Sequence, residues 1–415
     1  MEPVNSVPSY SDVCSLSVIQ LNARSLIARA SELNLLVSLN SADVIAIQET
    51  WLTKVHTAPE LRGYVWYGVN RESVANGDGA VGGGVGFYVR DSSPFSAVPV
   101  PSISPIEVAV ISVRDINGRR IYLTSIYVPP RTSIRALQNL AKLHLKFSIL
   151  FGDSNSHHPT WSGGAPTSRG LALHRMFTSH HMRVFGFSNI PTYIGGAGQH
   201  SSPDLVAVGH QVTVNIEHPQ VLDDAGSDHL PILTRVRCEI EKTEHTRSFW
   251  CSSTLDREGY LTHLAHSLQQ WQKRHTAIEF SPSSAYAEWT ECVLEATELF
   301  CRKTPCLRRN SSPSWYRSNR GVQQLIRERR RLRKRFQRRR DLVTYRAYQE
   351  SKNRTDKAIQ EAKDKVWERH CSNFNAKNMY RRLQGLTLKP VLPAVLESET
   401  GQHLTSDPQI ADGLC

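Results

Sequence analysis

The chain has 415 residues, enough for two or three domains, and its composition of 40% hydrophobic and 21% charged residues is that of a globular protein. It contains no apolar run of the roughly 18 residues that a membrane helix needs, and its eight irregularly spaced cysteines do not suggest a disulfide framework. The formal net charge of +12 arises entirely after residue 240: residues 1–240 hold 18 basic and 18 acidic side chains, and residues 241–415 hold 32 and 20. Basic regions attract polyanions, so we expect two regions with different roles.

Short β-branched runs separated by turn residues predict strands in the first region. These runs span residues 17–21, 44–47, 85–89, 108–111, 121–128, 148–151, 205–208 and 232–236. Apolar residues at helical spacing predict helices over 26–40, 133–146 and 168–182. So many strands with so few helices favour two sheets packed face to face, with helices outside them.

The sequence changes character after about residue 241. Helices are expected over 255–274 and 284–303, and Pro305 and Pro313 mark a linker. Residues 322–384 contain neither Gly nor Pro, which predicts a long basic helix or a helical hairpin.

An arginine-rich run lies within this region. Residues 317–340 contain twelve Lys or Arg and one acidic residue, Glu328. The run is interpretable as a solvated helix face, a nuclear-import signal or a nucleic-acid contact, and its charge exceeds what solvation requires. We therefore favour nucleic-acid binding. The expected contacts are Arg329, Arg330, Arg331, Arg333, Lys334, Arg335, Arg338, Arg339 and Arg340.

Acidic and polar residues gather where the predicted strands begin or end. They are Asn22, Glu49, Asp153, Asn155, Asp204, Asp228 and His229. Carboxylates at strand ends can converge on one rim of a sheet, where oxygen ligands suit Mg²⁺ or Mn²⁺ together with substrate phosphate oxygens. A histidine beside an aspartate is held in one tautomer and is readily charged. Each residue alone is more often a turn former, so the prediction depends on their order along the chain.

That order resembles a known family. The contexts Ile47-Gln48-Glu49-Thr50, Gly152-Asp153-Ser154-Asn155 and Ser227-Asp228-His229 resemble the exonuclease–endonuclease–phosphatase superfamily, and within it the endonuclease of jockey-like non-LTR retrotransposons. The resemblance covers about residues 15–240. It implies a four-layered α/β sandwich of two packed mixed β-sheets with outer helices, followed here by a mostly α-helical basic extension.

The resemblance also implies a role for each site residue. Glu49, Asn22 and Asp228 form the metal site; Asp153, Asn155, His229, Asp204 and Tyr127 are catalytic; Thr192 and Asn155 bind substrate. In this scheme Asp153 orients or deprotonates the attacking water. His229, oriented by Asp204, donates a hydrogen bond to a phosphate oxygen of the substrate.

The expected organisation follows from these two regions. It is a tail over 1–14, an endonuclease over 15–240, a helical linker over 241–312, a basic helical segment over 313–384 and the start of a truncated reverse-transcriptase region over 385–415.

The resemblance implies a Mg²⁺- or Mn²⁺-dependent DNA endonuclease whose nick leaves a 3′-hydroxyl that primes reverse transcription. The expected partners are target DNA and element RNA, the latter bound by the basic segment or by the absent reverse transcriptase. Neither a membrane nor a small-molecule substrate is expected, and the expected location is the nucleus. Two alternatives stay open: a phosphodiesterase or phosphatase of the same fold acting on a non-nucleic-acid substrate, and an inactive nucleic-acid-binding relic.

Overall fold

The structure is a computed structural model that describes most of the chain. The described residues are 16–53, 56–71, 82–143, 145–187, 190–195, 198–240, 248–250, 255–275, 282–301, 303–305, 312–372, 396–397 and 403–404. The expected tail over 1–14, and all of the expected terminal region over 385–415 except 396–397 and 403–404, lie outside them. The chain forms two compact units, one made of residues 1–243 and 310–415, the other of residues 244–309.

Two large mixed sheets form the centre of the first unit. The first has the order β13 (Asn215–Ile216), β15 (Ile232–Arg237), β1 (Leu16–Asn22), β2 (Val44–Gln48), β4 (Val85–Arg90) and β3 (Tyr64–Val69), with β14 (Gln220–Val221) also paired to β15. The second has the order β5 (Phe95–Ala97), β6 (Glu107–Arg114), β7 (Arg120–Tyr127), β8 (Ser148–Asp153), β12 (Asp204–Val208) and β9 (Arg183–Phe185). The β1–β2 and β7–β8 pairs are parallel, and the others are antiparallel.

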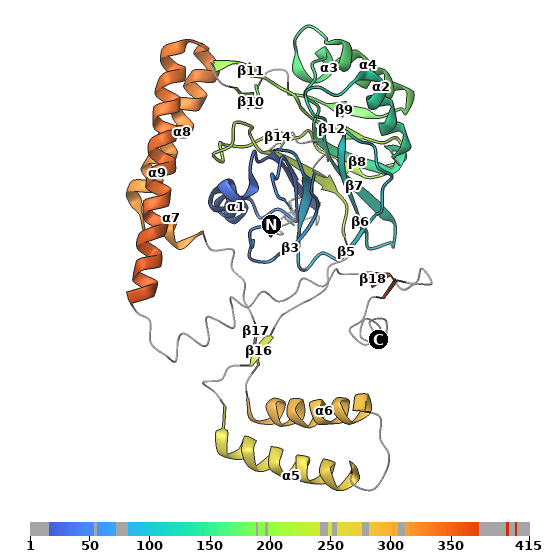
Figure 1. Cartoon of the computed structure of the whole chain (residues 1–415), viewed down its shortest axis with the longest axis vertical. Coiled ribbons are helices and arrows are strands. Elements are labelled where there is room, and N and C mark those ends of the chain that lie inside the picture. Colours follow the sequence, from blue (N-terminus) through green and yellow to red (C-terminus); the bar gives the residue numbers. More distant parts are fainter. Residues whose placement is uncertain are drawn as a thin grey trace, which may run out of the picture. The chain divides into compact units, whose positions relative to one another are not determined.

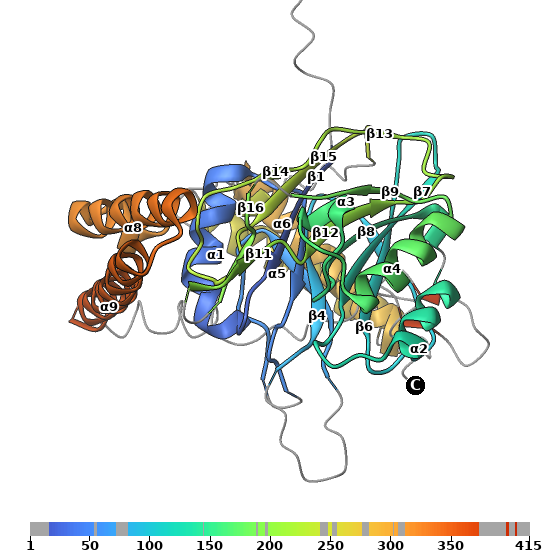
Figure 2. The ribbon, with the colours of Figure 1, turned by 90° about the horizontal axis from the view of Figure 1, so that it is seen from above.

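Three buried clusters define four layers (Figures 1 and 2). Alternate residues of both sheets, such as Val18 and Leu123, fill the space between them. The outer face of the first sheet packs against α1 (Leu26–Asn40). The outer face of the second is covered by α2 (Ile134–Leu137), η1 (Gln138–Lys142), η2 (Leu145–Phe147), α3 (Pro159–Ser162) and α4 (Ser168–Ser179). The expected four-layered sandwich is therefore confirmed.

The helix expected over 133–146 is not continuous. The chain forms α2 and then the two 3-10 segments η1 and η2. Leu137, Leu140 and Leu143 are all buried and recur every third residue, which matches the 3.0 residues per turn of a 3-10 helix better than the 3.6 of an α-helix. By contrast, the helix expected over 26–40 is observed with those bounds.

A helical hairpin completes the first unit. It consists of α7 (Ser314–Arg317), α8 (Arg320–Arg339) and α9 (Leu342–Ser372). Asn319 begins α8 by accepting the backbone N–H of Val322 at 3.1 Å. Buried residues of α7, α8 and α9 pack against Leu35 of α1, and Phe336 and Tyr348 pack against Ile194. The basic helices thus share one packed unit with the sandwich.

Smaller elements make up the rest of the described chain. In the first unit β10 (Tyr193–Ile194) pairs with β11 (His200–Ser201), and β18 (Leu396–Glu397) pairs with β19 (His403–Leu404). The second unit contains α5 (Arg257–His275), α6 (Pro282–Phe300) and the paired strands β16 (Ser248–Trp250) and β17 (Lys303–Pro305). Among the described helices, none combines the length and the apolar character needed to cross a membrane.

Candidate active site

The adjoining ends of two antiparallel strands bring the first two carboxylates together. β8 ends at Asp153 and β12 begins at Asp204, and these residues are direct partners in the ladder. Both side chains are buried. Ser154 joins the two strand ends, because its hydroxyl donates to the carbonyl of Pro203 at 2.7 Å.

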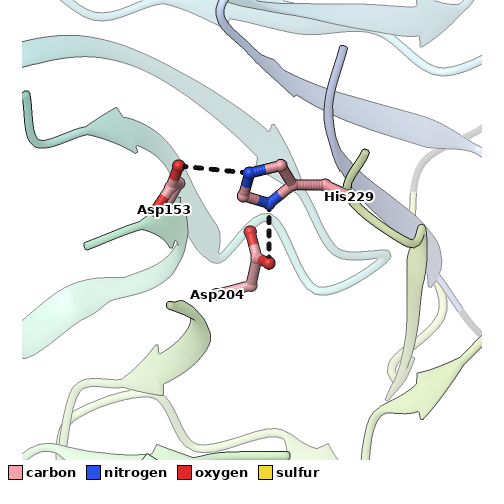
Figure 3. Close-up of side chains that lie close together, drawn as sticks. All are labelled: Asp153, Asp204 and His229. Atoms are coloured by element: carbon pink, nitrogen blue, oxygen red, sulfur yellow. Dashed lines mark hydrogen bonds and ion pairs between the residues drawn. The ribbon is translucent and has the colours of Figure 1, made fainter. Parts of the chain in front are cut away.

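His229 lies between these two carboxylates (Figure 3). Its Nδ1 is 2.9 Å from Oδ2 of Asp204, and its Nε2 is 3.8 Å from Oδ2 of Asp153. The hydroxyl of Thr192 donates to the same Asp204 oxygen at 2.5 Å. Because Thr192 is fully buried behind Asp204, it orients that carboxylate and does not reach the cavity. This contact corrects its expected role as a substrate ligand.

The surroundings of His229 favour its protonated form. Burial alone disfavours a charged imidazole, but the nearby Asp204 carboxylate, which is also its hydrogen-bond partner, and then Asp153 raise the pKa of His229. Burial raises the pKa of Asp153, and the charge on His229 opposes that shift. A protonated imidazole held by Asp204 can donate a hydrogen bond from Nε2 to an incoming oxygen.

Asn22 connects the carboxylates of the two sheets. Its Nδ2 donates to Oε1 of Glu49 and to Oδ2 of Asp153, both at 2.9 Å. Oε2 of Glu49 accepts from the indole N–H of Trp51 at 3.1 Å. Glu49 and Trp51 have φ angles of 51° and 54°, left-handed values that are uncommon outside glycine and that cluster at functional sites.

Two further donors flank Asp153. Tyr127 ends β7 as its register partner, and burial, followed by the charges of Glu49 and Asp153, raises the pKa of the phenol. The phenol therefore stays a neutral donor. The side-chain amide of Asn155 donates to the carbonyl of Val128 at 3.1 Å and to Oδ2 of Asp153 at 3.3 Å. These bonds hold Asn155 beside the carboxylate.

These side chains face an open cavity of about 530 Å³. It is lined by Arg24, Glu49, Trp51, Tyr127, Pro130, Asp153, Asn155, His157, Tyr193, Gln199, His200, Ser201, Pro203, Asp228 and His229. The sequence analysis did not assign Arg24, Trp51 or Tyr193 to the site. Arg24 Nη1 donates to Oδ2 of Asp228 at 2.6 Å. Since these two residues are 204 positions apart, no local pattern signals their contact.

The donor set at this rim fits a divalent cation. Carboxylates outnumber the cationic side chains of the site: they are Glu49, Asp153, Asp204 and Asp228 against Arg24 and protonated His229. Carboxylate oxygens with incomplete neutralisation are the ligands that Mg²⁺ and Mn²⁺ prefer. Glu49, Asp153 and Asp228 line the cavity and offer such oxygens to a cation.

Two residues expected in the metal site have other partners. Both carboxylate oxygens of Asp228 are engaged, Oδ2 by Arg24 and Oδ1 by the Ser227 hydroxyl at 3.2 Å. Asn22 presents its NH₂ to the carboxylates, while its Oδ1 accepts the backbone N–H of Arg24 at 3.1 Å. Asp228 lines the same cavity as Glu49 and Asp153, and the expected roles of Asp228 and Asn22 in the metal site stay predictions.

A second cluster with metal-ligand chemistry overlaps the first. Ligand atoms of Asp153, Asp204 and His229 lie within 4.8 Å of one another. Nδ1 of His229 is already hydrogen-bonded to Asp204. His229 and Asp204 thus form a hydrogen-bonded pair, and Oδ2 of Asp153 lies 3.8 Å from Nε2 of the same ring.

The arginine run divides into two sets. Arg329 and Arg333 are 0% and 1% exposed, and both pair with Asp224. They are therefore inaccessible to nucleic acid, which corrects that expectation. Arg331, Lys334, Arg335, Arg338, Arg339 and Arg340 are exposed, and Arg330 is half-buried.

A sequence signal separates the two sets. The buried residues of α8 are Val322, Ile326, Arg329, Arg333 and Phe336, which are spaced by four, three, four and three. This spacing marks the buried stripe of an amphipathic helix, and the two arginines lie on it. An open hollow of about 650 Å³ is lined by Asp223, Arg327, Arg330, Arg331, Lys334, Arg335, Arg338 and Arg339.

The chain is similar to several known proteins. Residues 121–233 match the family model described as "Endonuclease-reverse transcriptase". The chain is 29% identical over 217 residues to "RNA-directed DNA polymerase from mobile element jockey" of Drosophila funebris, covering 51% of this chain and 22% of that protein. It is 24% identical over 357 residues to "Probable RNA-directed DNA polymerase from transposon BS" of Drosophila melanogaster, covering 77% and 38%. This chain therefore spans well under half the length of these relatives.

A solved structure also matches. The endonuclease domain of TRAS1, described as a telomere-specific non-LTR retrotransposon, covers 54% of this chain and 99% of that chain, with 19% identity and a TM-score of 0.44.

The two facing mixed sheets with outer helices form the α/β sandwich that the resemblance to the exonuclease–endonuclease–phosphatase superfamily implies. His229, Asp204 and Asp153 lie together at one rim of this sandwich. The particular resemblance, to the endonuclease of jockey-like non-LTR retrotransposons, is confirmed by the family match and by the two relatives.

Proposed function

We propose that this chain is a Mg²⁺- or Mn²⁺-dependent endonuclease that nicks one strand of target DNA and leaves a 3′-hydroxyl. In the life cycle of a retrotransposon, that hydroxyl primes reverse transcription of the element's RNA. The observation that supports this function best is the buried His229–Asp204 pair, which faces Asp153 and lies beside Glu49 and Asn22.

Each active-site residue has its own role in the proposed hydrolysis. Asp153 accepts a proton from water, whose oxygen then bonds to phosphorus. His229 donates a hydrogen bond from Nε2 to a phosphate oxygen, and Tyr127 and Asn155 donate to the same group. The bond between phosphorus and O3′ breaks with its electron pair staying on O3′, which takes a proton from solvent water and leaves as a hydroxyl, and the proton on Asp153 passes to solvent. Glu49 and Asp153 would hold the divalent cation, which supplies positive charge to the phosphate oxygens.

We assign nucleic-acid binding to the exposed face of α8. Arg327, Arg331, Arg335, Arg338 and Arg339 form no ion pair with a described residue. Closely spaced cations without partners attract the phosphate backbone and release counterions when it binds. Target DNA is the proposed ligand, with element RNA as the second nucleic acid of the same chemistry. A protein with this function would act in the nucleus, and we propose that location.

The proposed domain organisation keeps the endonuclease over 15–240 and the basic helical segment over 313–384, and the two pack as one unit in the described residues.

A plasmid assay tests the function. Purified chain is incubated with supercoiled plasmid with and without Mg²⁺, and the relaxed product is quantified. The ends of the nick are then tested for extension by a DNA polymerase, which requires a free 3′-hydroxyl. Cation-dependent nicking with extendable ends is expected. Hydrolysis of a small phosphodiester without nicking would instead identify the phosphodiesterase, and DNA binding without hydrolysis would identify the inactive relic.

A further inference from the structure

The segment that carries Asp228 and His229 is hydrogen-bonded both within the sandwich and to α8. Residues 224–230, here called the catalytic loop, connect β14 to β15 and place both side chains in the cavity. Inside the sandwich, the hydroxyl of Ser227 donates to the carbonyl of Asn22 at 2.7 Å. The carbonyl of Asp228 accepts the backbone N–H of Ile194 at 3.0 Å.

Arg333 of α8 supplies further contacts to this loop. Its Nη1 donates to the carbonyl of Ser227 and its Nη2 to the carbonyl of Asp228, each at 3.0 Å. Nη1 is also 3.2 Å from Oδ1 of Asp224, at the start of the loop. The guanidinium is buried and lies over the ring of Tyr348, 5.7 Å from its centroid. One planar group therefore binds three points of the catalytic loop.

The planar fork of an arginine suits this task. Two nitrogens of one guanidinium reach two neighbouring carbonyls with fixed spacing, which a lysine ammonium cannot reproduce. Water is excluded from the buried contact, so removing the guanidinium would leave both carbonyls without the side-chain donor that they share. The loop would then be free to shift, and His229 would shift with it.

The neighbouring arginine makes a different set of contacts. Arg329 donates through Nη1 and Nη2 to the carboxylate of Glu32 on α1, and its Nε is 3.0 Å from Oδ2 of Asp224. Its contacts on the sandwich are thus with side chains, whereas Arg333 also binds the carbonyls of Ser227 and Asp228. Both arginines are almost fully buried and both anchor α8, so Arg329 is a matched control for Arg333.

We propose that Arg333 is a positioning residue of the active site, and that α8 is a structural part of the endonuclease rather than only its basic appendage. By fixing the carbonyls of Ser227 and Asp228, Arg333 holds the His229 imidazole in line between Asp204 and Asp153. This inference rests on the proposed endonuclease activity, which it extends to a helix that begins only at Arg320.

The test compares four forms of the full chain: wild type, Arg333→Met, Arg333→Lys and Arg329→Met. Nicking kinetics give kcat and KM separately, and urea unfolding gives the stability of each form. Arg333→Met is expected to lower kcat roughly 10²-fold with little change in KM, the size of effect that small displacements of catalytic groups produce. Arg333→Lys should recover part of the loss. Arg329→Met should lose stability and keep the wild-type kcat.

A second readout does not depend on activity. Amide hydrogen exchange in residues 225–230 should speed up in Arg333→Met and stay slow in Arg329→Met. If the two methionine variants lower kcat equally, or if Arg333→Met raises only KM, the positioning role is wrong. If wild type does not nick DNA, the proposed function fails instead, and exchange in the catalytic loop still decides whether Arg333 holds it. If Arg333→Met does not fold, kcat and amide exchange are compared between Arg333→Lys and Arg329→Lys instead.

Discussion

The side-chain amide of Asn22 donates to the carboxylate of Asp153 at 2.9 Å, and this bond joins the two sheets at the rim of the cavity. Asn22 ends β1 in the first sheet, and Asp153 ends β8 in the second. The same amide reaches Glu49. A single neutral group therefore sets the spacing of the two carboxylates that would hold a cation.

Asn22→Asp is expected to inactivate the chain. It replaces a shared donor with a third carboxylate, so the acidic groups repel one another and the spacing of Glu49 and Asp153 is lost. Asn22→Ala should destabilise the fold by about 1–3 kcal/mol, the cost of leaving buried acceptors without their donor. Nicking rates and urea unfolding measure the two effects. Wild-type nicking by Asn22→Asp would show that the spacing does not matter.

His229 and Asp204 should behave as one unit. Removing a donor to the reacting phosphate costs about 10²–10³ in kcat, so His229→Ala should lower kcat by that factor and leave KM nearly unchanged. Asp204→Asn should lower kcat similarly, because it leaves the imidazole without its anionic partner. The double variant should be no worse than the more severe single variant. Losses that multiply in the double variant would show that the two residues act separately.

The exposed face of α8 should control the salt dependence of binding. Arg331→Gln combined with Arg335→Gln removes two cations that form no ion pair with a described residue. On duplex DNA, the log–log slope of affinity against salt becomes shallower by about 0.9 for each phosphate that the protein no longer neutralises. The control is Arg119→Gln combined with Arg120→Gln at the start of β7, the end of that strand opposite Tyr127. Equal salt slopes for the two double variants would show that the DNA does not bind the exposed face of α8.

Much of the site was predictable because its chemistry lies at strand ends. Glu49, Asp153 and His229 each adjoin a short strand-forming run, and strand order together with the packing of the two sheets brings them to one rim. The contacts of Arg24 and Arg333 were not predictable, because their partners lie 204 and 105 positions away. A run of like charges does not show which members are buried.

The buried arginine network should weaken in acid. Burial favours the neutral form of Asp224, but Arg329 and then Arg333 outweigh it and lower the pKa of this carboxyl. The stabilisation that the group contributes is therefore present above the unfolded-state pKa of about 3.9 and is lost as the pH falls through the lower folded-state value.

Asp224→Asn should remove that dependence. The variant leaves two buried guanidinium groups with fewer anionic partners. Its free energy of unfolding should therefore be about 3–5 kcal/mol lower than that of wild type at neutral pH. The difference in the free energy of unfolding between the variant and wild type should become smaller below pH about 4. Urea unfolding of both forms from about pH 7 to about pH 2.5 measures it. A constant difference across this range would mean that Asp224 is not charged in the folded protein.

If the cavity hydrolyses a DNA phosphodiester with a cation bound at Glu49, the Glu49→Gln variant should lose this activity. The change keeps the shape of the side chain and removes its anionic charge. Glu60→Gln, an exposed residue outside the cavity lining, is the matched control. Nicking of supercoiled plasmid in Mg²⁺ should fall by orders of magnitude in Glu49→Gln at unchanged stability, and should stay at the wild-type rate in Glu60→Gln. Wild-type nicking by a folded Glu49→Gln variant would show that nicking does not need a cation bound by Glu49.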